Sequence, residues 1–152
     1  MGVLYSVAPL DNGLRDALPG MGVLRAPAAN GRHPTPQELR SVLADLKGYK
    51  ATFNDPAEVG DTWQASIEDA HDPESGPWTL LNVSEYKGEF EAAEMWFEKG
   101  WPDLIVTILV AVTAYTGPLV LLADCGGVPL VIQQGDDPEQ LYRSWQMDAE
   151  DE

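Results

Sequence analysis

Cysteine and basic residues are both scarce in this sequence. Cys125 is the single cysteine among 152 residues, which excludes an internal disulfide and a four-cysteine zinc site and favours an intracellular setting. Lysine and arginine total 9 against 25 acidic residues, so the formal net charge is −16. Such a chain lacks the positive charge with which proteins bind nucleic-acid phosphates, and we expect no nucleic-acid partner.

The first residues lack the basic region and the long apolar stretch of a secretory signal, which together with the scarcity of cysteine predicts a cytoplasmic protein. One uncharged run, Leu104 to Ala123, covers 20 residues and is long enough to be considered as a membrane span. Gly117-Pro118 interrupts this run, and no bias of lysine and arginine flanks it. We therefore interpret it as a buried helix followed by a buried strand and expect no membrane partner.

The sequence contains no recognisable catalytic or cofactor-binding motif. No motif that would activate a thiol surrounds Cys125, and Gly126-Gly127 lacks the lysine and the following helix of a phosphate-binding loop. Asp69-Ala70-His71-Asp72 holds several possible metal ligands, but without further converging donors it is typical of a polar loop. We therefore predict no catalytic residue, no metal ligand and no cofactor.

The composition is that of a folded domain. Hydrophobic residues make up 44% and charged residues 22% of the chain, which is close to the average of soluble globular proteins. The length fits one domain of roughly 100–150 residues. We predict a single domain over residues 1–147 and a disordered acidic tail over residues 148–152, where four of five residues are acids.

Two stretches carry the strongest helix signals. Thr35-Pro36-Gln37-Glu38 combines a threonine N-cap, a proline at the first helical position and a glutamate that can reach back to the cap amide. An apolar stripe follows and Gly48 can end it, which predicts a helix from about Pro36 to Lys47. Pro102-Asp103 begins a second predicted helix, over residues 102–116. Weaker signals predict short helices near Leu14–Leu18 and from Asp137 to about Trp145.

Short runs with aromatic and β-branched residues, bounded by turn residues, predict strands. These strands are residues 1–9, Tyr49–Phe53, Thr62–Ile67, Trp78–Tyr86, Leu119–Ala123 and Val128–Ile132. Glu89–Glu98 mixes helix-forming residues with an alternating apolar pattern, and we favour a strand. Asp124–Gly127 predicts a hairpin turn, and Pro129 predicts that the second arm lies at a sheet edge, because proline cannot donate to the ladder. Together these patterns predict an α+β domain with a mainly antiparallel sheet packed against two main helices, at about 36–47 and 102–116.

Acidic residues are concentrated in the second part of the chain. Residues 1–50 carry a net charge of +2 and residues 51–152 a net charge of −18, and no lysine or arginine lies between Lys50 and Lys87. Unneutralised carboxylates of this kind attract a basic protein, and tryptophans beside them can anchor it if they are exposed. The predicted partner-binding residues are Asp55, Glu58, Asp61, Trp63, Glu68, Asp69, Asp72, Glu74 and Trp78.

The stretch Trp101–Ile132, WPDLIVTILVAVTAYTGPLVLLADCGGVPLVI, combines a helix, a Gly-Pro break and an apolar hairpin with an Asp-x-Gly turn. It resembles a pattern found in small acidic bacterial proteins, some of them immunity proteins that neutralise toxins. The resemblance implies a single α+β domain that binds and blocks a cognate toxin without catalysing a reaction. It covers 32 residues at core and turn positions and so assigns no functional residue.

These observations predict a non-enzymatic binding protein, an inhibitor or immunity-type protein whose acidic face docks a basic partner protein. Two alternatives from other classes stay open. A small hydrolase or metal-dependent enzyme would use the acids near His71. An interaction or assembly subunit would carry its acidity for solubility alone.

Overall fold

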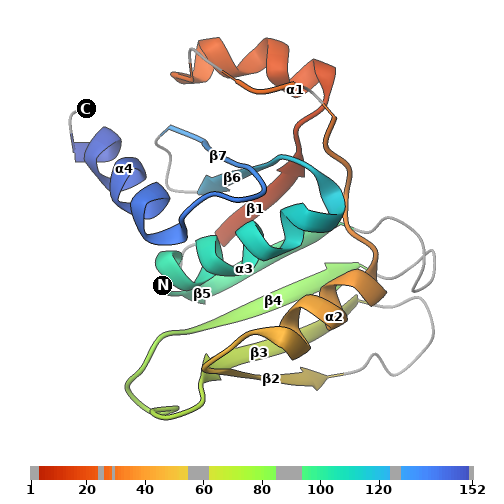
Figure 1. Cartoon of the computed structure of the whole chain (residues 1–152), viewed down its shortest axis with the longest axis vertical. Coiled ribbons are helices and arrows are strands. Elements are labelled where there is room, and N and C mark those ends of the chain that lie inside the picture. Colours follow the sequence, from red (N-terminus) through yellow and green to blue (C-terminus); the bar gives the residue numbers. More distant parts are fainter. Residues whose placement is uncertain are drawn as a thin grey trace.

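The computed structural model describes residues 4–23, 26–28, 30–54, 62–84, 94–123 and 128–150. Within these residues, seven strands form one antiparallel sheet in the order β2-β3-β4-β5-β1-β6-β7 (Figure 1). The strands are β1 (Leu4–Pro9), β2 (Tyr49–Asn54), β3 (Thr62–Asp69), β4 (Trp78–Ser84), β5 (Met95–Gly100), β6 (Leu119–Ala123) and β7 (Leu130–Ile132). The predicted α+β fold with an antiparallel sheet is therefore confirmed.

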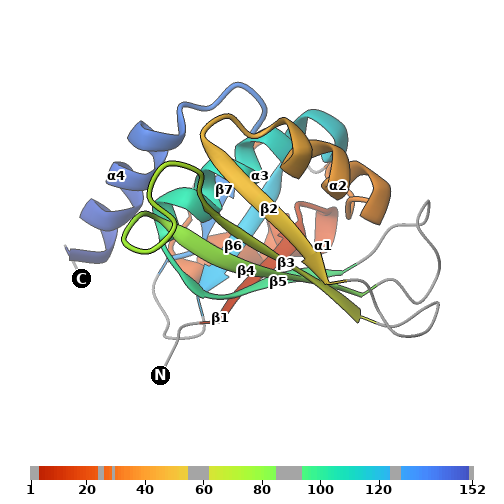
Figure 2. The same cartoon turned by 90° about the horizontal axis from the view of Figure 1, so that it is seen from below.

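Three helices cover one face of the sheet (Figure 2). They are α2 (Pro36–Asp45), α3 (Pro102–Thr116) and α4 (Pro138–Glu150). Helix α3 contributes much of the buried core, because it presents apolar side chains around most of its circumference, including Leu104, Ile105, Ile108 and Leu109, each at most 1% exposed. These side chains belong to the same buried cluster as the inward residues of β1 and β3 to β7.

A smaller apolar cluster lies on the other face of the sheet, beside β6 and β7. Helix α1 (Asn12–Ala17) and the 3₁₀ helix η1 (Leu18–Met21) form it, with Leu10, Leu18 and Val120 fully buried. Val120 alternates along β6 with Leu119 and Leu121, which belong to the main core. Both faces of β6 are therefore packed, as its continuous apolar sequence predicts.

Helix α2 forms as its local sequence predicts. The Thr35 hydroxyl accepts from the Glu38 amide at 3.1 Å, and the Glu38 carboxylate accepts from the Thr35 amide at 2.9 Å, which completes the capping box. The helix ends at Asp45, before the predicted end at Lys47, because Leu46 is already extended. Gly48 has the expected left-handed conformation, with φ of 82°.

The uncharged run from residue 104 to 123 is divided as predicted between α3 and β6. Gly117 separates them at φ of 76°, and a Cβ atom there would lie 3.0 Å from the Asn30 carbonyl oxygen. Glycine is therefore required both by the backbone conformation and by the close approach of the loop. Among the described residues, none of the helices has the length and apolar character needed to cross a membrane.

The other predicted strands are present, with shifted ends. β4 ends at Ser84 and β5 begins at Met95, so a strand is confirmed for the last part of Glu89–Glu98, while residues 85–93 lie outside the described residues. β7 begins at Leu130, directly after Pro129, and is an edge strand as predicted. The predicted hairpin turn at Asp124–Gly127 lies outside the described residues.

Helix α4 is longer than predicted. It was expected to end near Trp145 but reaches Glu150, so residues 148–150, predicted as part of a disordered tail, are helical, and residues 151–152 lie outside the described residues. Leu141 and Trp145 pack against the main core, and the Trp145 indole nitrogen donates to the Val128 carbonyl at 2.8 Å. These contacts hold α4 against the rest of the domain. The acidic residues at the C-terminal end of α4 gave no indication of this packing.

Candidate protein-binding surface

The described residues place no helix on the other face of β2, β3, β4 and β5 (Figure 2). Alternate residues of each strand point to this face, because successive side chains in a strand point to opposite sides. In β3, Trp63, Ala65 and Ile67 enter the core. Their neighbours therefore form rows on the uncovered face with residues of the adjoining strands. The rows are Lys50, Glu68 and Trp78; Thr52, Ser66, Leu80 and Glu98; and Gln64, Asn82 and Trp96.

Two exposed tryptophans lie at the end of the sheet where β4 begins and β5 ends. Trp78 is 40% exposed and lies directly opposite Glu68 in the β3–β4 ladder. Trp101 is 44% exposed, and its amide donates to the Trp78 carbonyl at 3.0 Å. Most large apolar side chains of this domain are buried, so an exposed pair beside a carboxylate is a candidate for recognition.

The loop between β3 and β4, residues 70–77, extends this end with further carboxylates. Asp69 Oδ1 accepts from the His71 amide at 2.8 Å and from the Asp72 amide at 3.1 Å, and Asp72 Oδ1 accepts from the Ser75 amide at 3.2 Å. Such side-chain bonds replace backbone ones in a tight loop. Asp69 and Asp72 therefore shape the loop, while Glu74 is exposed on it.

A shallow hollow of about 430 Å³ lies farther along the uncovered face. Leu4, Ser6, Ala8 and Trp96 line it from β1 and β5, together with His33 and Glu94. Burial lowers the pKa of His33, and the charges of Glu94 and Asp11 oppose this effect. The hollow thus combines apolar lining with a histidine that is held toward its neutral form.

The structure describes six of the nine predicted partner-binding residues. Asp55, Glu58 and Asp61 lie outside the described residues. Glu68, Asp69, Asp72, Glu74 and Trp78 all lie in or beside the β3–β4 loop. The predicted residues that are described and accessible therefore gather at one end of the sheet.

Trp63 was predicted as an anchor on condition of exposure, and this prediction is wrong because its side chain is 1% exposed. It points into the core from β3, with its ring centroid 5.8 Å from that of Phe53. The Arg40 guanidinium lies over the indole, 4.7 Å from the ring centroid, and contributes a cation–π interaction. Trp63 is thus a core residue that helps to join β3 to α2.

A second concave site, the α3–α4 cleft, opens at the same end of the molecule as Trp78 but on the helical side of the sheet. It has a volume of about 450 Å³ and joins the start of β2 to the first turns of α3 and α4. Its lining residues are Tyr49, Asp103, Thr107, Pro138, Glu139, Tyr142 and Arg143. This volume falls within the range of about 300–1,000 Å³ that is typical of small-ligand pockets.

The electrostatics of the α3–α4 cleft are set by its carboxylates. Burial raises the pKa of both Tyr49 and Tyr142, and the negative charge of Asp103 raises each further. Asp69 adds to the effect on Tyr49. The phenols therefore stay protonated and stand in a negative field.

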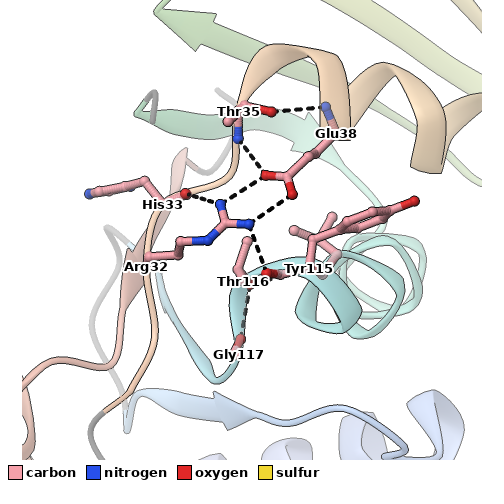
Figure 3. A network of polar contacts seen from close by, with 8 residues as sticks. Arg32, His33, Thr35, Glu38, Tyr115, Thr116 and Gly117 are labelled. Carbon is pink, nitrogen blue, oxygen red and sulfur yellow. Dashed lines mark hydrogen bonds and ion pairs between the residues drawn. The ribbon is translucent and has the colours of Figure 1, made fainter. Parts of the chain in front are cut away.

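Arg32 joins the loop before α2 to both main helices (Figure 3). Its guanidinium donates to both oxygens of Glu38, each at 2.8 Å, and to the Tyr115 carbonyl at 2.9 Å. The hydrogen bonds from Arg32 lower the pKa of Glu38, against the opposing effect of burial. This network joins the loop before α2 to the first turn of α2 and the end of α3.

The acids near His71 were the predicted alternative for an enzyme. In the part of the chain that the structure describes, no three histidine, cysteine or acidic side chains converge in a way that could hold a metal ion. His71 is exposed in the β3–β4 loop, and Cys125 lies outside the described residues.

The residues of the α3–α4 cleft were missed by sequence reasoning. Tyr49, Asp103 and Tyr142 belong to three segments that are far apart in the chain, and no local spacing relates them.

Comparisons with known protein families, curated proteins and solved structures found no match to this chain.

Proposed function

We propose that this protein is a non-enzymatic binding protein, of inhibitor or immunity type, that docks a basic partner protein on the surface formed by Glu68, Trp78 and the β3–β4 loop. The observation that carries the proposal is Trp78, an exposed aromatic side chain directly opposite Glu68 and beside an acidic loop. Aromatic anchors supply much of the affinity of protein interfaces, and surrounding charges guide the approach of the partner. A toxin as this partner is supported by the resemblance of Trp101–Ile132 to immunity proteins.

The charge of the chain supports a basic partner. The net charge of −16 attracts positive proteins over a distance of about 8 Å, the screening length at physiological ionic strength. Near Trp78, the carboxylates of Glu68, Asp72 and Glu74 outnumber the ammonium of Lys50, the cross-strand neighbour of Glu68. The partner surface should therefore be rich in lysine or arginine.

The test begins with proteins of the native host that bind the immobilised chain and are eluted by salt. With the purified partner, surface plasmon resonance then compares two variants. Trp78→Ala should weaken binding by about 30-fold, mainly through faster dissociation, because it removes an anchor. Glu68→Gln/Glu74→Gln should slow association and flatten its dependence on salt, and it leaves the loop hydrogen bonds of Asp69 and Asp72 in place.

Matched controls lie elsewhere on the molecule. Tyr115 is 47% exposed at the end of α3, so Tyr115→Ala removes a comparable aromatic group away from the proposed surface. Asp16 is exposed in α1, so Asp16→Asn removes one carboxylate charge away from this surface, against the two that the double glutamate variant removes on it. If Trp78→Ala and the double glutamate variant behave like these controls, the surface does not bind the partner, and the acidity serves solubility alone.

A further inference from the structure

The α3–α4 cleft has the composition of a site for an organic cation. It holds two tyrosines, Tyr49 and Tyr142, and two carboxylates, Asp103 and Glu139. We propose that this cleft binds a guanidinium or ammonium group, supplied by an arginine or lysine side chain of the basic partner. This inference rests on the proposed function and assigns to it a specific pocket.

The two tyrosines provide aromatic surfaces from different parts of the fold. Tyr49 begins β2 and Tyr142 lies in the second turn of α4, and both line the cleft. A cation close to such a ring is attracted by the negative face of its π system, and the attraction is stronger where the site is partly removed from water. Both tyrosines are half-buried, so the cleft offers partial removal from water.

The charges of the cleft also favour a cation. The lining residues carry two carboxylates, Asp103 and Glu139, and one guanidinium, Arg143, which forms an exposed ion pair with Glu139 within α4, so the charge of the lining is negative. Burial is the main cause of the raised pKa values of both tyrosines, and the negative charge of Asp103 raises them further. A guanidinium in the cleft would compensate the charge of Asp103, and its planar shape suits both stacking on tyrosine and bonding to a carboxylate.

An anion is the opposite possibility, since the first turns of α3 and α4 both line the cleft and helix N-termini attract anions. Three of the amides there are already bonded to carboxylates of the chain. Asp103 Oδ1 accepts from the Leu104 amide at 2.9 Å, and Asp137 Oδ1 accepts from the amides of Glu139 and Gln140 at 3.0 and 3.3 Å. The carboxylate groups of Asp103 and Asp137 therefore occupy positions at these helix amides that a bound anion would take.

The cleft and the proposed binding surface adjoin one another. Tyr49 is the cross-strand neighbour of Asp69, where the acidic loop begins. Asp103 follows Trp101 by two residues, and the Trp101 amide is bonded to the Trp78 carbonyl. A partner that covers Trp78 can therefore place one basic side chain in the cleft.

The experiment uses a free probe before any partner is known. N-acetyl-arginine amide is titrated into the protein with isotope-labelled tyrosine rings, and NMR follows the ring signals of Tyr49 and Tyr142. We expect saturable shifts of both signals. The citrulline analogue, which has the same shape without the charge, should bind at least about tenfold more weakly. Inorganic phosphate should leave both signals unchanged.

Two variants test the residues that hold the probe. Asp103→Asn removes the charge and Tyr142→Leu removes one ring, and each should weaken probe binding by about tenfold or more. Asp16→Asn, in α1, is the control of equal charge change and should leave binding unchanged. Circular dichroism and thermal unfolding establish that each variant is folded. If Tyr142→Leu does not fold, probe binding by Asp103→Asn decides the test.

The outcomes separate this inference from the proposed function. Three results would each overturn the cation site, whatever Trp78→Ala does to partner binding. They are the lack of a saturable shift with the arginine probe, equally tight binding of the citrulline analogue, and shifts caused by phosphate instead. If the probe binds and Asp103→Asn also weakens partner binding by tenfold, the cation is a side chain of the partner. If the probe binds and partner affinity is unchanged, the cation site stands and its ligand is a free amine, which overturns the assignment to the partner.

Discussion

The ion pair between Arg32 and Glu38 should stabilise the domain more than an ordinary surface pair does. Arg32 donates to both Glu38 oxygens at 2.8 Å, and Glu38 is at the same time the glutamate of the capping box, with Thr35 as the N-cap of α2. The Glu38 side chain is 14% exposed and that of Arg32 is 49% exposed. A hydrogen bond to a charged group contributes about 1.5–3 kcal/mol when buried, and the exposure of Arg32 reduces this, so we expect a coupling free energy of about 1–2 kcal/mol for the pair.

A double-mutant cycle isolates this coupling. Arg32→Ala, Glu38→Gln and the double variant are compared by urea unfolding, followed by tryptophan fluorescence. Glu38→Gln is suitable because glutamine can also complete a capping box. The bonds from Arg32 to the Tyr115 and His33 carbonyls cancel in the cycle, since they are lost with and without Glu38.

The pair Glu139–Arg143 is the matched control. Its side chains are 71% and 70% exposed and lie one turn apart in α4, so its coupling should be about 0.5 kcal/mol or less. A coupling of the Arg32–Glu38 pair no larger than that of this control would refute the argument from burial and geometry.

The coupling should also depend on pH in a defined direction. Arg32 lowers the pKa of Glu38 in the folded state below its ordinary value, which the unfolded chain restores. The contribution of Glu38 is therefore complete above its unfolded-state pKa and is lost as the pH falls through its lower, folded-state pKa. The cycle repeated from about pH 7 to about pH 2 should show this loss, and a coupling that persists in acid would contradict it.

Two further predictions concern the β3–β4 loop and the α3–α4 cleft. Gly76→Ala should destabilise the domain by about 1–3 kcal/mol in urea unfolding, because the new Cβ atom would lie 2.6 Å from the Cβ atom of Asp69. Gly20→Ala is the control, because no atom lies within 4 Å of a Cβ atom at that position, and it should be neutral or slightly stabilising. Asp103→Asn should lower the pKa values of Tyr49 and Tyr142, since it removes a negative charge that raises both, while the effect of burial remains. NMR titration of the labelled tyrosine rings measures this, and unchanged pKa values would show that Asp103 does not set the field of the cleft.

The sequence alone predicted those features of the fold that depend on interactions between neighbouring residues. The capping box at Thr35 and Glu38 and the break at Gly117 act within a few residues, and the structure has both as predicted. Gly48 is left-handed as predicted, but it does not end helix α2, which stops at Asp45. Strand positions could be predicted for the same reason, because alternation and bounding turn residues are properties of short segments. The order of the strands could not, since the sheet places β1 between β5 and β6, far from it in the chain.

The candidate sites depended on tertiary structure. The sequence indicated that tryptophans and acids share one segment, but only the pleat and pairing of β3 and β4 place Trp63 in the core and Trp78 on the surface. The acidity of that segment was evident from the sequence, whereas the place of Glu68 beside Trp78 follows from the pairing of β3 with β4. The α3–α4 cleft had no local signal at all, because Tyr49, Asp103 and Tyr142 meet only when three separate elements pack together. Charge and local conformation are thus determined by composition and neighbouring residues, while exposure and the convergence of distant side chains are decided by packing.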